Sequence, residues 1–138
     1  MLLEWSEHLS IDHAEIDQEH RYMMRLIDRL YNTPNNGVCL DEMENLFGDF
    51  VYFMAVHFQH EEQLMTEVEY PKLATHAKEH DCLIATYASY FYDRGARDRI
   101  ARQRALTELS MLIIEHIKAF DRPLAFFCKA NQSIAECA

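Results

Sequence analysis

Apolar residues recur at intervals of three and four positions in four stretches of the chain, and this spacing is typical of one face of an α-helix. The four stretches are residues 12–31, 41–67, 71–94 and 98–121. The alternating apolar and polar pattern of a β-strand does not extend over any useful length. The pattern therefore predicts an all-α protein with four long helices.

Short polar segments join the predicted helices. Asp41 with Glu44 predicts a capping pair at the start of the second helix. Asp121 and Pro123 predict the end of the fourth helix, followed by a short C-terminal helical tail. Because short connections make neighbouring helices antiparallel, we expect an up-down-up-down four-helix bundle. All 138 residues fit a single domain, with residues 1–11 as an N-terminal arm packed on the bundle.

Six polar residues interrupt the apolar stripes of the predicted helices. They are His20, His57, Glu61, His76, His80 and His116. Residues four positions apart lie on the same helix face, so the 57/61 and 76/80 pairs each point into the bundle. A buried polar group without a partner costs about 1–3 kcal/mol, and an unpaired charge costs more. Imidazole nitrogens and carboxylate oxygens are good metal ligands, so the pattern predicts a buried metal centre.

The number and kind of these residues indicate two metal ions. Five histidines exceed what one tetrahedral zinc ion takes, and structural zinc sites favour thiolates. A ferritin-like di-iron site uses Glu-x-x-His, and no histidine in this sequence has Glu three positions before it. A lone histidine such as His20 is more often an ordinary core residue. On four helices together, the five histidines favour two ions that accept more than four ligands.

Composition narrows the choice of partner and compartment. The chain has 23 acidic and 13 basic side chains and a formal net charge of −10, which disfavours binding to nucleic acid or to an anionic membrane surface. No apolar run approaches the length of a membrane span, and the first residues do not resemble a secretory signal. The four cysteines form no C-x-x-C pair, so we expect reduced thiols and a cytoplasmic protein.

The candidate ligands lie within a longer series of motifs. In chain order these are Ile16–His20, His57–Glu62 with Met65, Tyr70–Pro71, His76 with His80, and His116–Ile117 with Asp121. The series spans nearly the whole chain and resembles the bacteriohemerythrins, which belong to the hemerythrin-like family. The resemblance implies a protein, not an enzyme, that binds dioxygen reversibly at a non-haem di-iron centre for oxygen transport, storage or sensing.

The resemblance also implies how the two irons are held. One iron takes the three histidines of the third and fourth predicted helices, and the other takes the two remaining histidines: His76, His80 and His116 for the first, His20 and His57 for the second. Glu61 and Asp121 are then expected to bridge the irons, together with an oxo or hydroxo group. The iron with fewer histidines keeps an open position, which is where a small molecule binds.

The fourth predicted helix carries two further expectations. Asp121 follows His116 by five positions, a turn of about 140° on a regular α-helix, so both reach the metals only if the helix end is distorted or the side chain of Asp121 reaches back. Ile113, Ile117 and Phe120 neighbour His116 on that helix and are predicted to line the oxygen pocket.

Three other histidines, His8, His13 and His60, have no place in the family's motifs, and we expect His60 to be exposed to solvent. Many relatives have Gln directly before the first histidine ligand, whereas this chain has Gln18 and then Glu19.

Other functions are compatible with the same ligand set. The chain can be a signalling domain that passes an oxygen or redox state to a partner or to an output domain. It can also be a di-iron enzyme that acts on peroxide or nitric oxide at the open iron. A structural site with two zinc ions is the most distant alternative.

Overall fold

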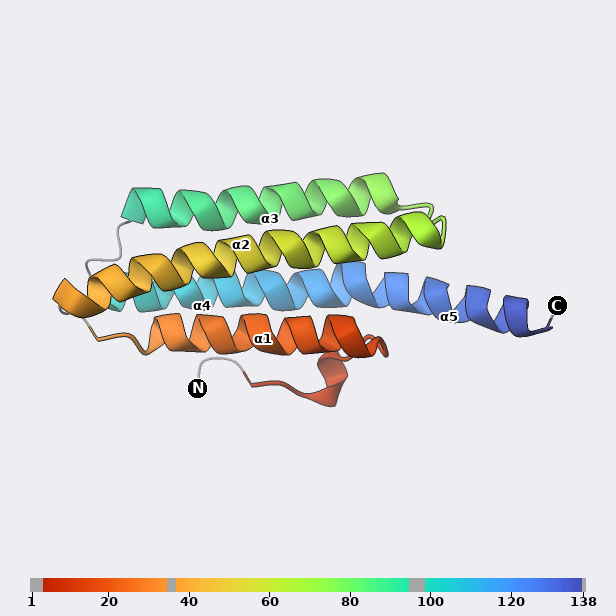
Figure 1. Cartoon of the computed structure of the whole chain (residues 1–138), viewed down its shortest axis with the longest axis horizontal. Coiled ribbons are helices and arrows are strands. Elements are labelled where there is room, and N and C mark those ends of the chain that lie inside the picture. Colours follow the sequence, from red (N-terminus) through yellow and green to blue (C-terminus); the bar gives the residue numbers. More distant parts are fainter. Residues whose placement is uncertain (1–3, 35–36, 95–98, 138) are drawn as a thin grey trace.

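The computed structural model describes residues 4–34, 37–94 and 99–137, and in these residues it consists of helices and their connections (Figure 1). Four long helices form the body: α1 (Ala14–Tyr31), α2 (Gly37–Glu67), α3 (Leu73–Arg94) and α4 (Arg99–His116). Helix α1 packs against α2 and α4, and α3 packs against the same two helices, so the four close into a bundle. The predicted all-α four-helix bundle is confirmed.

Helix α2 begins earlier than the capping signal indicated. It starts at Gly37, so Asp41 lies inside the helix and the predicted capping pair with Glu44 is wrong. Acidic residues are tolerated within helices at a small cost, and a capping motif alone therefore does not fix where a helix begins.

The end of the fourth helix also differs from the prediction. After α4 the chain makes a π-helical turn, η2 (Ile117–Asp121), and continues directly into α5 (Arg122–Cys137). The predicted C-terminal helical tail is confirmed as α5, whereas the predicted break between it and the fourth helix at Asp121 and Pro123 is wrong. Pro123 falls in the first turn of α5, directly after the π-helical turn, and has no N–H to donate to the preceding turn. Figure 1 shows α5 extending past the end of the bundle.

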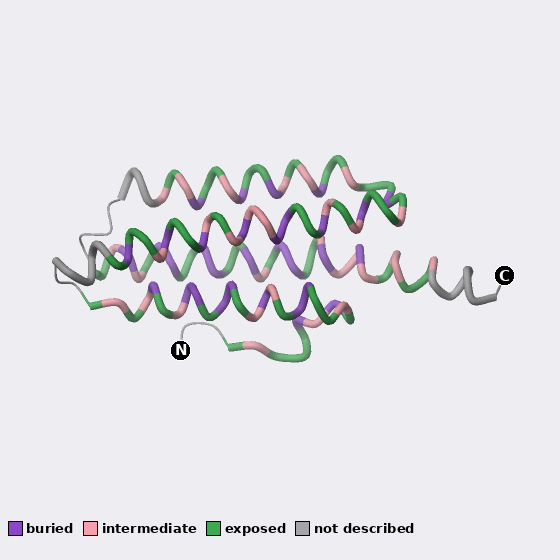
Figure 2. Tube along the Cα trace, viewed as in Figure 1, coloured by how far each residue is buried: buried purple, intermediate pink, exposed green. Residues whose placement is uncertain are grey.

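Apolar side chains fill the space between the helices. Buried residues follow the inward faces of the helices along the length of the bundle (Figure 2). The core includes Ile27, Phe50, Met54, Tyr87 and Leu106, each at most 1% exposed. Burying side chains of this size stabilises the fold by about 1.5–3 kcal/mol each, so packing of these faces holds the helices in place.

The N-terminal arm is fastened to the side of the bundle, as the sequence indicated. It contains a short 3₁₀ turn, η1 (Glu7–Leu9), and buries Leu9 and Ile11 against the core. The carboxylate of Asp17 in α1 accepts hydrogen bonds from the Ser10 hydroxyl at 2.6 Å and from the Ile11 N–H at 3.0 Å. The arm also touches α5, because Arg122 donates to the His8 carbonyl.

Within the described part of the chain, no helix combines the length and the apolar character needed to cross a membrane.

Candidate metal centre

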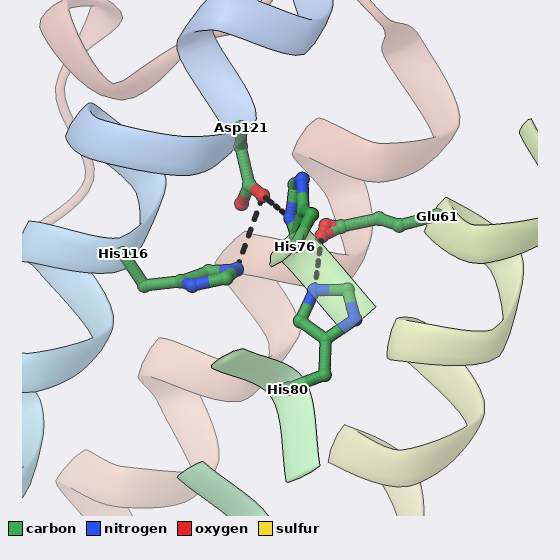
Figure 3. Close-up of side chains that lie close together, drawn as sticks. All are labelled: Glu61, His76, His80, His116 and Asp121. Atoms are coloured by element: carbon green, nitrogen blue, oxygen red, sulfur yellow. Dashed lines mark ion pairs between the residues drawn. The ribbon is translucent and has the colours of Figure 1, made fainter. Parts of the chain in front are cut away.

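Seven polar side chains converge inside the bundle at the end where α2 meets α3. All are at most 4% exposed, and all were predicted from the sequence: His20, His57, Glu61, His76, His80, His116 and Asp121. Each of the four long helices contributes at least one, and η2 contributes the last. Figure 3 shows five of them pointing toward a common centre.

The π-helical turn explains how two residues five positions apart face the same point. A π-helix bonds each N–H to the carbonyl five residues earlier, so it completes a turn over a longer stretch than an α-helix does. The Arg122 N–H bonds to the Ile117 carbonyl in this way. Asp121 is thereby brought over His116, with 3.1 Å between Asp121 Oδ1 and His116 Nε2. Of the two alternatives that the spacing left open, the structure has the distorted helix end.

Asp121 lies at the centre of the histidines. Its Oδ1 atom is 3.0 Å from His76 Nε2, and its Oδ2 atom is 3.2 Å from His20 Nε2. One carboxylate therefore contacts histidines of both groups that the resemblance implied.

Glu61 is placed in the same manner. Its Oε1 atom is 3.5 Å from His57 Nε2 and 3.5 Å from His80 Nε2. Like Asp121, it stands between a histidine of one group and a histidine of the other.

The potential ligand atoms form two overlapping groups, in each of which every atom lies within 4.8 Å of the others. The larger group contains Glu61, His76, His80, His116 and Asp121. The smaller one contains His20, His57, Glu61 and Asp121. We call these the three-histidine group and the two-histidine group. They share both carboxylates, so the arrangement suits two adjacent ions bridged by carboxylate oxygens.

The hydrogen bonding of these side chains tests whether metal ions fit. Although nitrogens and oxygens approach within 3.0–3.5 Å, twelve buried atoms of the seven residues make no hydrogen bond within the described part of the chain. Native proteins leave few buried polar atoms without a partner. Metal ions bound by the Nε2 atoms and the carboxylate oxygens would satisfy most of them, and a donor set of imidazole and carboxylate suits iron. The cluster fits a di-iron centre.

The two carboxyl groups differ in their affinity for protons. Burial raises the pKa of Glu61 well above its usual value, and the charge of the neighbouring Asp121 raises it further. Burial also acts to raise the pKa of Asp121, but His116, His20 and His76 outweigh it, so that this pKa is well below the usual value. Protons therefore compete with metal more strongly at Glu61 than at Asp121.

The histidines of the three-histidine group are also unequal. Burial, with the neighbouring His76 and His116, lowers the pKa of His80 to about 2. Its imidazole is thus neutral near pH 7, the form that binds metal. For His116, burial lowers the pKa, but the adjacent carboxylate of Asp121 reverses the shift and the net pKa is raised.

Two acidic residues outside the cluster contact the Nδ1 atoms of two of its histidines. Glu19 Oε1 lies 3.1 Å from His57 Nδ1, and Glu62 Oε2 lies 3.2 Å from His80 Nδ1. The helical pattern of the sequence predicted no role for either residue. Their position in the sequence could have indicated this role, because each directly precedes or follows a predicted ligand, His20 or Glu61. Neighbouring residues on a helix point about 100° apart, so these side chains can reach a ligand on the next helix.

Aromatic rings wall the three-histidine group. The Phe120 ring stacks on His116 with centroids 5.3 Å apart and lies 5.5 Å from the ring of His76. Phe58, which sequence analysis did not single out, stacks on His80 with centroids 3.9 Å apart. Phe120 is half-buried, and its role in lining the oxygen pocket stays a prediction.

The isoleucines predicted to line that pocket are both buried: Ile113 is 3% exposed and Ile117 is 1% exposed. Their place in the apolar core is settled by this burial, whereas a contact with dioxygen stays a prediction.

The remaining histidines lie outside the cluster. His13 caps α1, because its Nδ1 atom accepts a hydrogen bond from the Ile16 N–H, and His8 is exposed. The side chain of His60 is 53% exposed, as expected, yet its Nδ1 atom lies 2.6 Å from Glu19 Oε2.

Comparison with known proteins agrees with the geometry of this site. Residues 12–124 match the family model of the hemerythrin HHE cation-binding domain. The match covers most of the chain, which therefore belongs to the hemerythrin family.

Among curated proteins the chain is similar to several bacteriohemerythrins. It is 29% identical over 130 residues to the one from Stenotrophomonas maltophilia (strain R551-3), which covers 94% of this chain and 84% of that protein. It is 27% identical over 89 residues to the one from Clostridium acetobutylicum, covering 62% and 69%. A myohemerythrin from Theromyzon tessulatum is 24% identical over 118 residues, covering 86% and 87%. No solved structure gives a significant match.

Proposed function

We propose that this protein binds dioxygen reversibly at a non-haem di-iron centre formed by the seven converging side chains. The observation that carries the proposal is the pair of overlapping ligand groups, which share both Glu61 and Asp121. Such sharing places two ions next to each other, and the buried atoms without hydrogen bonds provide the lone pairs to hold them. The similarity to hemerythrins supports dioxygen as the ligand.

In this proposal the two ligand groups have different tasks. The three-histidine group would hold one iron with three nitrogens and two carboxylate oxygens. The two-histidine group offers one nitrogen fewer and would leave its iron a free position for a small molecule. When bound, the ferrous pair supplies the electrons for reversible binding of dioxygen.

The surrounding residues keep water away from this position. Ile113 and Ile117 come from α4 and η2 and are buried beside the cluster's His116. We propose that they and Phe120 form an apolar lining that protects the oxygenated protein from protons and solvent. On this account the chain is a dioxygen-binding protein for transport or storage and not an enzyme. The free thiols of Cys82 and Cys128 agree with a reducing compartment such as the cytoplasm.

Visible spectroscopy of the reduced protein tests the proposal. Protein reduced without oxygen is expected to develop a new visible absorption band when air is admitted, and to lose it when oxygen is removed. A band that cannot be reversed, or no band in protein that contains iron, would contradict reversible binding.

A further inference from the structure

A hydrogen-bonded chain connects the surface of the protein to the two-histidine group. His60 Nδ1 lies 2.6 Å from Glu19 Oε2, and Glu19 Oε1 lies 3.1 Å from His57 Nδ1. The exposure of the side chains falls along the chain, from 53% at His60 to 17% at Glu19 and 0% at His57. Each oxygen of one carboxylate is therefore engaged by a different histidine.

The hydrogen-bonded chain of His60, Glu19 and His57 connects two helices. His57 and His60 are one turn apart on α2, so their side chains lie on adjacent positions of the same face. Glu19 reaches them from α1 across the interface of the two helices. A groove of about 620 Å³ opens over this point and is lined by Glu19 and His60 together with Gln18, Tyr22, Phe53 and Gln63. The outer end of the chain is thus in contact with solvent.

The hydrogen bond from His57 to Glu19 determines which nitrogen of His57 is free to bind metal. An ionised carboxylate only accepts hydrogen bonds, so the Nδ1 atom of His57 carries the proton and donates to Glu19. The Nε2 atom then keeps its lone pair, and it lies on the side of the ring that faces Glu61, 3.5 Å from Glu61 Oε1. Without Glu19, neither the tautomer nor the orientation of the ring is fixed from this side.

We propose that Glu19 is a positioning residue for the two-histidine group and that the exposed His60 holds Glu19 in place. The affinity of the metal position that takes dioxygen thereby depends on a side chain at the surface. This inference rests on the proposed function, because it takes His57 to be a ligand of the second iron.

The three-histidine group offers an internal comparison. Its His80 donates to Glu62 at 3.2 Å in the same way, but from the other side of the cluster. Changes at Glu19 and His60 are therefore expected to loosen only one of the two irons. A general loss of packing would loosen both.

The experiment compares iron retention in the diferrous protein under a coloured ferrous chelator, without oxygen. Loss of an outer partner of a metal-bound histidine weakens metal binding by about 10–100-fold. In Glu19→Ala, half of the iron is expected to pass to the chelator at a concentration about 10-fold lower than in wild type, while the other half is retained as before. His60→Ala is expected to shift the same half by a smaller factor.

Conservative and control variants separate positioning from folding. Glu19→Gln keeps an oxygen that accepts from the His57 Nδ1–H, so it is expected to restore much of the retention lost in Glu19→Ala. Glu15→Ala, one turn earlier on α1, and Gln59→Ala, beside His60 on α2, change exposed residues and are expected to behave as wild type. Proton NMR of the diferrous protein adds a second readout: the exchangeable Nδ1–H signal of His57 is expected to be lost in Glu19→Ala and retained in Glu19→Gln.

The outcomes distinguish the two proposals. Wild-type protein that holds fewer than two irons would overturn the proposed function, and this inference with it. Two irons in wild type, with unchanged retention in both Glu19→Ala and His60→Ala, would overturn the positioning role alone. Equal loss of both irons in these variants would do the same. Since His60 is exposed, His60→Ala keeps the test decisive even if Glu19→Ala does not fold.

Discussion

The two ends of the bundle core treat buried polar groups in opposite ways. At the end away from the cluster, Phe50 packs on Tyr87 with ring centroids 5.4 Å apart, and Leu106 is 1% exposed beside them in the same core. Two polar side chains described there have partners within the protein: the Tyr87 hydroxyl donates to the Leu109 carbonyl, and Arg102 donates to the carbonyl of Thr33.

At the other end, the same four helices bury five imidazoles and two carboxylates, and twelve of their atoms have no hydrogen bond within the described residues. Hydrophobic packing thus accounts for the bundle at one end, whereas the other end buries polar groups that the described residues do not satisfy. We infer that the fold and the site are stabilised separately: the apolar end positions the helices, and bound metal would compensate the polar end.

Removing the metal is expected to have the largest effect on the stability of the folded protein, and to destabilise the polar end more than the apolar end. A ligand present at 1,000 times its dissociation constant stabilises the folded state by about 4 kcal/mol, and this is lost on chelation. Amide hydrogen exchange is expected to accelerate strongly around His57, His76 and His116 and much less around Phe50 and Tyr87. Uniform acceleration along the helices would show that the ends are not independent.

Acidification is expected to release iron, because protons and metal compete for the same atoms. The sign follows from Glu61 and His116, whose pKa values are raised in the folded chain, so that they take up protons first as the pH falls. Asp121 and His80 have lowered pKa values, so they take up protons only at lower pH. Iron content after desalting at successive pH values measures this. Release on mild alkalinisation instead would contradict the ligand set.

A cavity at the apolar end is expected to cost stability without costing metal. Phe50→Ala removes a fully buried ring and is expected to destabilise the protein by about 3–5 kcal/mol. The iron content of the folded variant is expected to equal that of wild type. Tyr52→Ala, at a residue of the same helix that is 74% exposed, is the matched control for chemical denaturation. Iron loss in folded Phe50→Ala would show that packing at the apolar end and metal binding at the polar end depend on each other.

Ile113 lies where the two regions meet, so its removal is expected to affect both to a smaller degree. Ile113→Ala leaves a cavity and is expected to lower the free energy of unfolding by about 2–5 kcal/mol. We also expect faster autoxidation, since water gains access to the iron pair. The decay of the oxygenated spectrum at equal iron content measures this. An equal or slower decay would show that Ile113 does not guard the site.

The same comparison explains what the sequence predicts well. Ligands and core residues share the helical period, so the stripe that predicts α2 also contains His57 and Glu61. Long helices with a clear stripe were therefore predicted together with six of the seven converging residues. Asp121 and the division of the ligands between two irons came from the resemblance to a family, and those roles stay a proposal.

The helical period does not predict two other features of the structure, the continuation of the helix at Pro123 and the contacts of Glu19 and Glu62. A proline usually indicates a helix end, but Pro123 lies in the first turn of α5 after a π-helical turn, which the local sequence does not reveal. Glu19 and Glu62 lie one step off the stripes and act on histidines of neighbouring helices, so only the packing of α1, α2 and α3 reveals their contacts.

The most direct test of the account is the metal content of the purified protein. After expression with ample iron, elemental analysis is expected to give two irons per chain, because the two ligand groups share carboxylates and each is complete enough to hold an ion. One zinc ion per chain and no iron would contradict the di-iron centre, and with it the view that metal stabilises the polar end of this bundle.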